Sequence, residues 1–158
     1  MKSLFLCLSA FILLSTAAAP ALRAEADQRV KKALDELGVK YTIDDDGDYA
    51  VTIAYEDEGR SQLVFVVSET DSVEGFEIRD VFSFAVMGKT PTLEMTSGLM
   101  RASGKSVIGA FEMDSSGNIL YLAKIPANLP PKQLHRIIRT VAAYADDAEK
   151  EILGSDKL

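Results

Sequence analysis

Apolar and polar residues alternate along several segments between residues 41 and 125, and this alternation leaves few folds open. Successive side chains of a strand point to opposite faces, so alternation predicts strands that bury one face of a sheet. The segment 62–68 is apolar at both parities, which is typical of a central strand. The expected strands cover residues 41–43, 49–56, 62–68, 76–86, 107–113 and 119–125.

Polar segments separate the expected strands. Asp46-Gly47 is typical of a tight hairpin turn, because glycine accepts the positive φ that such turns require. We expect residues 69–75 to form a polar loop and residues 114–118 to close a second hairpin. Within residues 76–86 every second residue is apolar except Asp80, and this interruption predicts a bend or bulge near Arg79-Asp80.

Three segments carry helical signals instead. Asp27 can cap a helix that ends at Gly38, and Thr90-Pro91 predicts the start of a second helix, with the threonine as N-cap. Pro131 begins the third helix. Its apolar residues recur at the helical period over several turns: Leu134, Ile137, Ile138, Val141, Ala145, Ala148 and Ile152.

Together these segments predict an α+β protein, in which helices pack on an antiparallel sheet of five to six strands. The predicted order of elements is α-β-β-β-(β)-α-β-β-α. A chain of 158 residues is long enough for one domain with a substantial core. We expect residues 27–158 to form that single domain.

Residues 1–26 have the three-part layout of a secretory signal peptide. Lys2 precedes the apolar stretch Leu4–Leu14, and small residues follow up to Ala24 and Ala26, after either of which cleavage is expected. Serine, threonine and proline within the leader weaken the alternative interpretation as a membrane anchor. The leader therefore predicts export to the periplasm or the medium of a bacterial cell, without membrane insertion after cleavage.

The single cysteine, Cys7, lies within this leader. The small residue expected before a lipid-modified cysteine is missing, so a lipoprotein is not predicted. Cleavage would leave the domain without a thiol for a disulfide or a nucleophile. The net charge of the whole chain is −7, and an acidic surface repels nucleic acid and anionic lipid.

The aspartates around Gly47 are the composition of either a calcium loop or a hairpin turn. An EF-hand with Gly47 at position 6 would have Asp44 and Asp46 as ligands, but Thr42 and Ile53 would fall at positions 1 and 12. The bidentate glutamate is therefore missing, and the flanking segments have strand rather than helix period. We interpret the stretch as a hairpin turn.

Two groups of residues could support catalysis, and neither forms a known motif. His135 is the single histidine, so it has no second histidine or cysteine with which to complete a metal site. A cluster of carboxylates on the last helix, Asp146, Asp147, Glu149 and Glu151, alternates with core positions. We interpret this cluster as the exposed face of the helix.

Phe76, Phe82 and Phe84 could stack on a ligand, but without tryptophan or a basic patch we interpret them as core residues. No nucleophile elbow, phosphate-binding glycine loop or zinc-protease motif is present in the sequence. We therefore predict no enzymatic activity, no catalytic, cofactor-binding or metal-binding residues, and no cofactor.

The order of elements and three stretches of sequence resemble the YbjN-domain family. The stretches are VKKALDELGVKYTIDDDGDYAVTI, LMRASGKSVIGAFEMDSSGNILYLAKIP and LPPKQLHRIIRTVAAYADDAEKEI. That family looks like the type III secretion chaperones in fold, and the resemblance covers residues 28–153. It implies a protein-binding or chaperone-like role without enzymatic activity. Secretion chaperones act in the cytosol, so the predicted export signal separates this chain from their secretion role.

We therefore expect an exported, non-enzymatic protein-binding or chaperone-like module of the cell envelope. Its expected partner is another protein or a second copy of the chain. The alternative is a carrier that holds a lipid or peptide in a cavity between sheet and helices, favoured by the phenylalanines and methionines between residues 76 and 113. A hydrolase or metal enzyme built on carboxylates is a further alternative, which the missing motifs disfavour.

Overall fold

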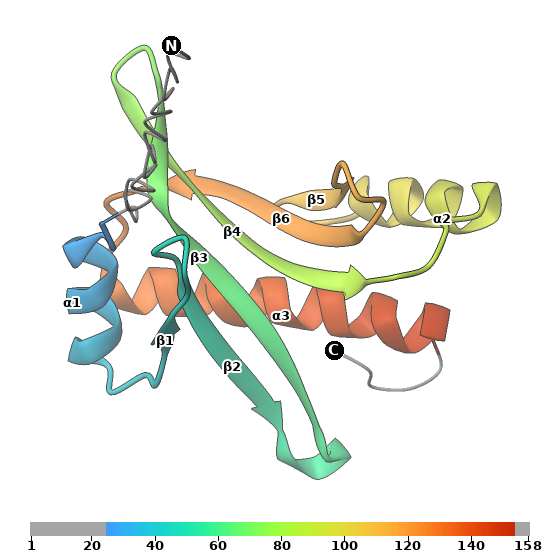
Figure 1. Cartoon of the computed structure of the whole chain (residues 1–158), viewed down its shortest axis with the longest axis horizontal. Helices are drawn as coiled ribbons and strands as arrows, with labels where there is room; N and C mark the ends of the chain where they lie inside the picture. Colours follow the sequence, from blue (N-terminus) through green and yellow to red (C-terminus); the bar gives the residue numbers. More distant parts are fainter. Residues whose placement is uncertain (1–24, 154–158) are drawn as a thin grey trace, which may run out of the picture.

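The computed structural model describes residues 25–153 (Figure 1). Within these residues the order of elements is α1, β1 to β4, α2, β5, β6 and α3, with a short 3-10 turn, η1, between β2 and β3. The bounds are α1 Gln28–Glu36, β1 Thr42–Ile43, β2 Tyr49–Tyr55, η1 Glu56–Glu58, β3 Arg60–Val73, β4 Phe76–Val86, α2 Leu93–Ser103, β5 Ala110–Met113, β6 Ile119–Pro126 and α3 Pro131–Leu153.

The strands form one antiparallel sheet in the order β1-β2-β3-β4-β6-β5. α3 runs across the sheet, packing most closely on β4, while α1 lies near the first turns of α3 and α2 lies beside β5 (Figure 1). The predicted α+β class, antiparallel sheet and order of elements are therefore confirmed, with six strands.

The N-cap of α1 also connects the helix to the sheet. The Asp27 carboxylate accepts a hydrogen bond from the backbone N–H of Arg29 at 2.7 Å and pairs with the guanidinium of Arg79, which is 1% exposed. The backbone N–H of Asp27 donates to Ser68 Oγ at 3.1 Å, and its carbonyl accepts from the Tyr49 hydroxyl at 2.9 Å. The predicted cap is confirmed, and it anchors the start of the domain.

The turn between β1 and β2 is the hairpin predicted at Asp46-Gly47. Gly47 has a φ of 89°, and Asp44 Oδ1 accepts hydrogen bonds from the N–H groups of Asp46 and Asp48 at 3.1 and 2.9 Å. The Asp44 side chain therefore stabilises the turn itself. Within residues 25–153, no group of three or more His, Cys, Asp or Glu residues is arranged to hold a metal ion.

β3 is longer than predicted. Residues 69–75, predicted as a loop, continue the strand to Val73, and only Glu74 and Gly75 have the positive φ of a turn. The loop prediction was wrong because this part of the β3–β4 hairpin projects beyond the helices (Figure 1). Both faces are therefore largely exposed and tolerate polar residues, so the strand has no apolar alternation there.

The irregularity predicted near Arg79-Asp80 lies mainly on the neighbouring strand. Val66 pairs with Val81 and Thr70 pairs with Arg79, so three residues of β3 face a single residue of β4. The guanidinium of Arg79 donates hydrogen bonds to two carbonyls of this bulge. The bulge thus supplies the acceptors that a buried guanidinium requires, and the parity of β4 alone could not show which strand is bulged.

Two boundaries beside β5 differ from the prediction. The N-cap of α2 is Thr92, two residues after the predicted cap, and its Oγ1 accepts from the Met95 N–H at 3.2 Å. Pro91 therefore precedes the cap instead of opening the helix. Val107, predicted within a strand, is exposed, because Gly109 turns the chain with a φ of 76° before β5 begins.

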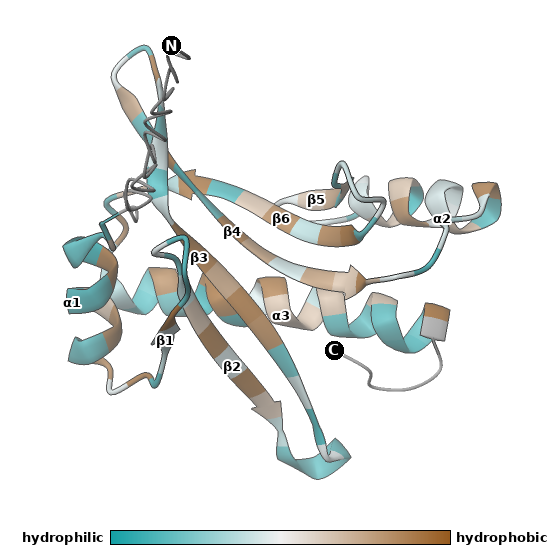
Figure 2. Ribbon diagram, viewed as in Figure 1, coloured by the Kyte–Doolittle hydropathy of each residue, from teal (hydrophilic) through white to brown (hydrophobic). Residues whose placement is uncertain are grey.

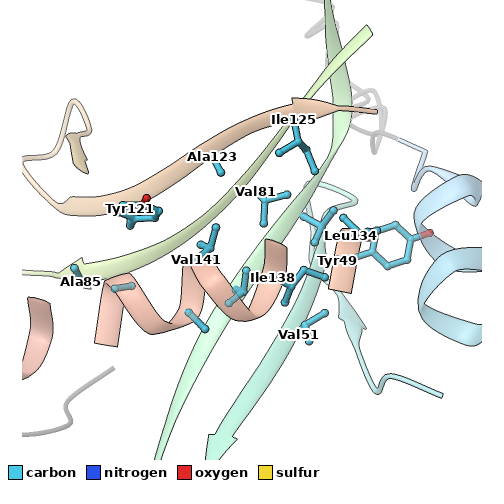
Figure 3. Packing of buried hydrophobic residues seen from close by; sticks show 14 of the residues in the cluster. Tyr49, Val51, Val81, Ala85, Tyr121, Ala123, Ile125, Leu134, Ile138 and Val141 are labelled. Atoms are coloured by element: carbon cyan, nitrogen blue, oxygen red, sulfur yellow. The ribbon is translucent and has the colours of Figure 1, made fainter. Parts of the chain in front are cut away.

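The core lies between α3 and one face of the sheet, called the inner face. α3 begins at Pro131 as predicted. It contributes Leu134, Ile138, Val141, Ala142, Ala145 and Ala148 to the core. Inner-face residues opposite the helix include Tyr49, Val51, Val81, Ala85, Tyr121, Ala123 and Ile125 (Figure 3). Tyr121 also stacks on Tyr144 of α3 with ring centroids 4.6 Å apart.

The predicted leader, residues 1–26, lies outside the described residues except for Glu25 and Ala26. Ala26 is partly buried against the core, and its carbonyl accepts a hydrogen bond from Gln28 Nε2 at 3.0 Å. No helix within residues 25–153 combines the length and the apolar character needed to cross a membrane.

Candidate functional site

The face of the sheet opposite to α3, called the outer face, carries a row of apolar side chains across five strands. The register places Ala50, Phe65, Phe82, Leu122 and Ala110 successively opposite one another on β2, β3, β4, β6 and β5. Their sequence neighbours on β3 and β4 are buried: Val64, Val66 and Val81 in the core, and the polar Ser83 beside them in the sequence. Because adjacent strand residues point to opposite faces, this row points away from the core.

The middle of the row forms an aromatic cluster. The Phe65 and Phe82 rings stack with centroids 5.0 Å apart and planes at 16°. Phe84 meets them edge-on, at 5.5 Å from Phe82 and 6.2 Å from Phe65. The three rings are half-buried, and Leu63 beside them is 39% exposed. We call Leu63, Phe65, Phe82, Phe84 and Leu122 the outer patch.

The helices lie on the other side of the sheet. Each of them contributes to the one core cluster on the inner face, through Leu34 of α1, Leu99 of α2 and Ile138 of α3. Among the described residues, the outer patch is therefore left without a helix over it. Figure 2 shows hydrophobic residues along β2 and β3, and residues of both faces contribute to this colouring. On the outer face the adjoining apolar side chains of the outer patch are partly exposed, and such groups commonly mark an interaction site.

One end of the outer patch is acidic. A surface hollow of about 240 Å³ lies beyond Phe82 toward the hairpin tip. Val67 and Ile78 form its apolar wall, and Glu69, Asp71 and Asp80 surround them. Asp80 pairs with Lys124 at 2.8 Å, which raises the pKa of that lysine. A ligand that runs along β4 from the outer patch toward the hairpin tip would thus contact the apolar rings first and the carboxylates next.

Phe82 and Phe84 were predicted as core residues, and this prediction was wrong, since both lie on the outer face. Phe76 lies near the hairpin tip and is 73% exposed. The alternation along β4 shows that these rings share one face of the strand. It does not show whether the helices cover that face or the opposite one. The covered face of β4 includes the polar residues Arg79 and Ser83, which makes it look less like a core in the sequence.

The carboxylates of α3 were predicted to form its exposed face, and half of them do not. Asp147 and Glu151 are exposed, whereas Asp146 and Glu149 are 4% and 0% exposed. Asp146 forms an ion pair with Arg60 of β3 at 2.5 Å, with both side chains largely buried. Asp146 therefore joins the β2–β3 hairpin to α3, a structural task that accounts for its burial.

His135 lies half-buried near the start of α3. Asp146 follows eleven residues later on the same helix, which corresponds to an axial separation of about 16 Å. The structure therefore does not bring the histidine together with the buried carboxylate.

A second hollow, of about 330 Å³, lies between α1 and the connection from β6 to α3, and Arg29, Arg79 and Leu129 are among its lining residues. Both guanidiniums are already paired, Arg29 with Asp27 and Glu77, and Arg79 with Asp27. This hollow opens at the surface, whereas core side chains fill the space between the sheet and the N-terminal half of α3. It therefore gives the predicted carrier function less support than the outer patch gives protein binding.

A solved structure with a similar fold is that of the HopA1-SchA chaperone-effector complex. A chain of this complex superposes with a TM-score of 0.54 at 11% sequence identity, and the match covers 78% of this chain and 91% of the other. At this identity the likeness concerns the fold alone, and it supports the secretion-chaperone-like fold predicted above. No curated protein matches the sequence.

The family comparison is more direct, because it covers nearly the whole described chain. Residues 26–154 match the family YbjN, whose description reads "Putative bacterial sensory transduction regulator". The predicted family resemblance is therefore confirmed, and the chain belongs to the YbjN family.

Proposed function

We propose that this protein is a non-enzymatic protein-binding module, and that its outer patch holds an extended, apolar segment of a partner protein. The observation that carries the proposal is the apolar row across five strands on the face that no described helix covers. The fold is complete on the inner side, so the rings of Phe65, Phe82 and Phe84 are not needed to fill the core.

The geometry of the outer patch favours an extended segment over a single bulky anchor. Its rings lie side by side across β3 and β4 instead of surrounding a deep hole. A segment that runs along β4 would cover Phe84 and Phe82 in turn, with Phe65 and Leu122 on either side. Toward the hairpin tip it would meet Glu69, Asp71 and Asp80. The partner segment should therefore combine apolar residues with a lysine or arginine at one end.

The proposal includes export, because residues 1–26 have the layout of a signal peptide. Cleavage after Ala24 would keep Ala26 on the core, whereas cleavage after Ala26 would remove that contact. The intact mass of the protein from a periplasmic extract distinguishes the two positions. Full-length protein confined to the cytosol would contradict export but not protein binding.

Differential capture tests the proposed function. The tagged protein is purified from its native cells after mild crosslinking, in parallel with the variant Phe65→Ser/Phe82→Ser. The matched control is Val73→Ser/Phe76→Ser, which also removes an apolar cross-strand pair, but at the hairpin tip. Loss of two central aromatic contacts typically costs at least about 2 kcal/mol of binding, a factor of about 30.

We expect a partner that the wild type and the tip control capture and that the outer-patch variant loses. All three proteins must show the same circular dichroism spectrum, so that loss of capture is not loss of fold. Equal capture by the outer-patch variant, or loss by the tip control alone, would contradict the proposal. If the captured partner is a second copy of the chain, sedimentation of the purified wild type will show a dimer that the outer-patch variant lacks.

A further inference from the structure

α2 stands apart from the main helix layer. It packs mainly on β5 (Figure 1), and Leu99 is its buried residue. Between α2 and the C-terminal half of α3 the surface is hollowed to about 440 Å³, which lies within the roughly 300–1,000 Å³ of typical ligand clefts. We call this hollow the helix groove.

The helix groove has an apolar floor and an acidic rim. Apolar and aromatic side chains from α2, β5 and α3 line it: Met95, Leu99, Ala102, Phe111, Tyr144, Ala148 and Ile152. The charged lining residues are Glu94 and Arg101 of α2 and Asp147 and Glu151 of α3. Three carboxylates thus face one guanidinium, and the rim favours a cationic ligand.

The two long walls of the helix groove determine the conformation of its occupant. Both α2 and α3 satisfy their backbone hydrogen bonds internally. β5 is an edge strand, but the N–H of Phe111, its residue in the groove, already donates to Ser103 Oγ of α2 at 2.9 Å. An extended peptide would therefore place unpaired N–H and carbonyl groups on an apolar floor, which is unfavourable. A helix satisfies its own backbone groups, and its side chains pack between the ridges of the two wall helices.

The methionines of the described residues gather in the same part of the molecule. Met95 and Met100 lie in α2, Met87 lies before it, and Met113 lies in β5. Met100 and Met113 line a smaller hollow, of about 210 Å³, which shares Leu99 and Phe111 with the helix groove. Methionine side chains are flexible and polarizable, so surfaces rich in them adapt to the shape of a helical ligand.

We propose that the helix groove is a second docking site, which binds an amphipathic helix of a partner protein. The helix places its apolar face on the floor and its lysine or arginine residues against Glu94, Asp147 and Glu151. This site lies on α2 and α3, whereas the outer patch lies on the opposite face of the sheet. The inference therefore stands independently of the proposed function.

Gly98 provides a variant that closes the groove without disturbing the fold. It lines the groove from α2, and a Cβ built on it meets no atom within 4 Å. Glycine within a helix is about 0.5–1 kcal/mol less favourable than alanine, so a side chain here should not unfold α2. Gly98→Phe therefore fills the groove while the helix is retained.

The probe is a fluorescent 18-residue peptide of leucine and lysine in an amphipathic helical pattern, with binding measured by anisotropy on the full chain. We expect the wild type to bind it, and Gly98→Phe and Glu151→Lys each to weaken binding at least about tenfold. Asp45→Lys reverses a charge in the exposed β1–β2 turn and should weaken binding much less. A peptide with glutamate in place of lysine should not bind.

Three results would overturn the inference. Wild-type affinity in Gly98→Phe would show that the peptide lies elsewhere. Equal weakening by Asp45→Lys and Glu151→Lys would show attraction to the net charge only. A wild-type dimer that Gly98→Phe dissociates would identify a second copy as the occupant. Phe82→Ser should leave the affinity for the peptide unchanged. A result that contradicts the helix groove as a binding site is therefore distinguishable from a result that contradicts the outer patch as one.

Discussion

The buried ion pair between Asp27 and Arg79 links the first helix to the middle of the sheet. Arg79 is fully buried, and Asp27 supplies its counter-charge. Burial raises the pKa of Asp27, but hydrogen bonds from Arg29 and Arg79 outweigh this effect and hold the pKa well below its usual range. The sequence shows Asp27 as a helix cap, but it gives no sign of Arg79 as its partner, 52 residues away.

Asp27→Asn should lower the free energy of unfolding at pH 7 by about 3 kcal/mol, because a buried guanidinium loses its counter-charge. Asparagine can still cap the helix, so the change isolates the charge. Urea titration followed by circular dichroism measures the effect. Asp45→Asn, in the exposed β1–β2 turn, is the control and should change stability by less than about 0.5 kcal/mol.

The same pair predicts acid sensitivity. The folded pKa of Asp27 is depressed, so its contribution to stability is fully present above the unfolded pKa of about 3.9 and is lost as the pH falls below that value. Glu77 acts in the same direction, because hydrogen bonds from Arg29 and Thr70 lower its pKa to about 2. Wild-type stability should fall between about pH 4 and pH 2, and that of Asp27→Asn should fall less. Parallel pH curves for the two proteins would contradict the assignment.

Gly109 is required by a close contact between backbones. It has a φ of 76°, and a Cβ at this position would lie 2.3 Å from the carbonyl oxygen of Leu122 on the neighbouring strand. Gly109→Ala should therefore lower the free energy of unfolding, measured by urea titration, by more than about 2 kcal/mol. Gly59→Ala is the control, with a φ of 64° but open space around it, and should cost only about 1 kcal/mol. Equal costs would mean that φ alone matters.

At the scale of elements, the sequence predicts α3 from its apolar stripe and most strands from the alternation of apolar and polar residues. It does not predict the boundaries of β3, α2 and β5. Polar residues and turn residues there depend on exposure to solvent as much as on backbone conformation. The bulge shows the same limit. Its position depends on the acceptors that the Arg79 guanidinium needs from β3, which are distant in the sequence.

The β2–β3 hairpin is held on α3 by the pair between Arg60 and Asp146. Asp146→Ala should lower the free energy of unfolding by about 1–2 kcal/mol, because the largely buried guanidinium of Arg60 then keeps only the exposed carboxylate of Glu58 as its partner. The neighbouring Asp147 is exposed, so Asp147→Ala should change stability by less than about 0.5 kcal/mol. Thermal unfolding of the two variants in parallel measures the difference. Similar midpoints would show that the ion pair contributes little.

At the scale of the whole molecule, the helices close one face of the sheet and leave the other open. The parity of each strand was readable from the sequence, but the covered face was not. β4 carries phenylalanines on its outer face and both a guanidinium and a hydroxyl on its inner face. The partners of Arg79 and Ser83, including Asp27 and Gln62, come from distant segments. The outer patch was therefore visible in the sequence as residues but misassigned to the core.

The measurement that tests the role of the outer patch most directly is site-specific photocrosslinking in intact cells. Benzoylphenylalanine replaces Phe82 in one protein and Phe76 in another, so the same probe sits on the outer patch or near the exposed hairpin tip. We predict that the probe at position 82 attaches to an apolar segment of one partner protein at high yield, and that the probe at position 76 does not. A partner crosslinked from position 76 but not from position 82 would contradict the account.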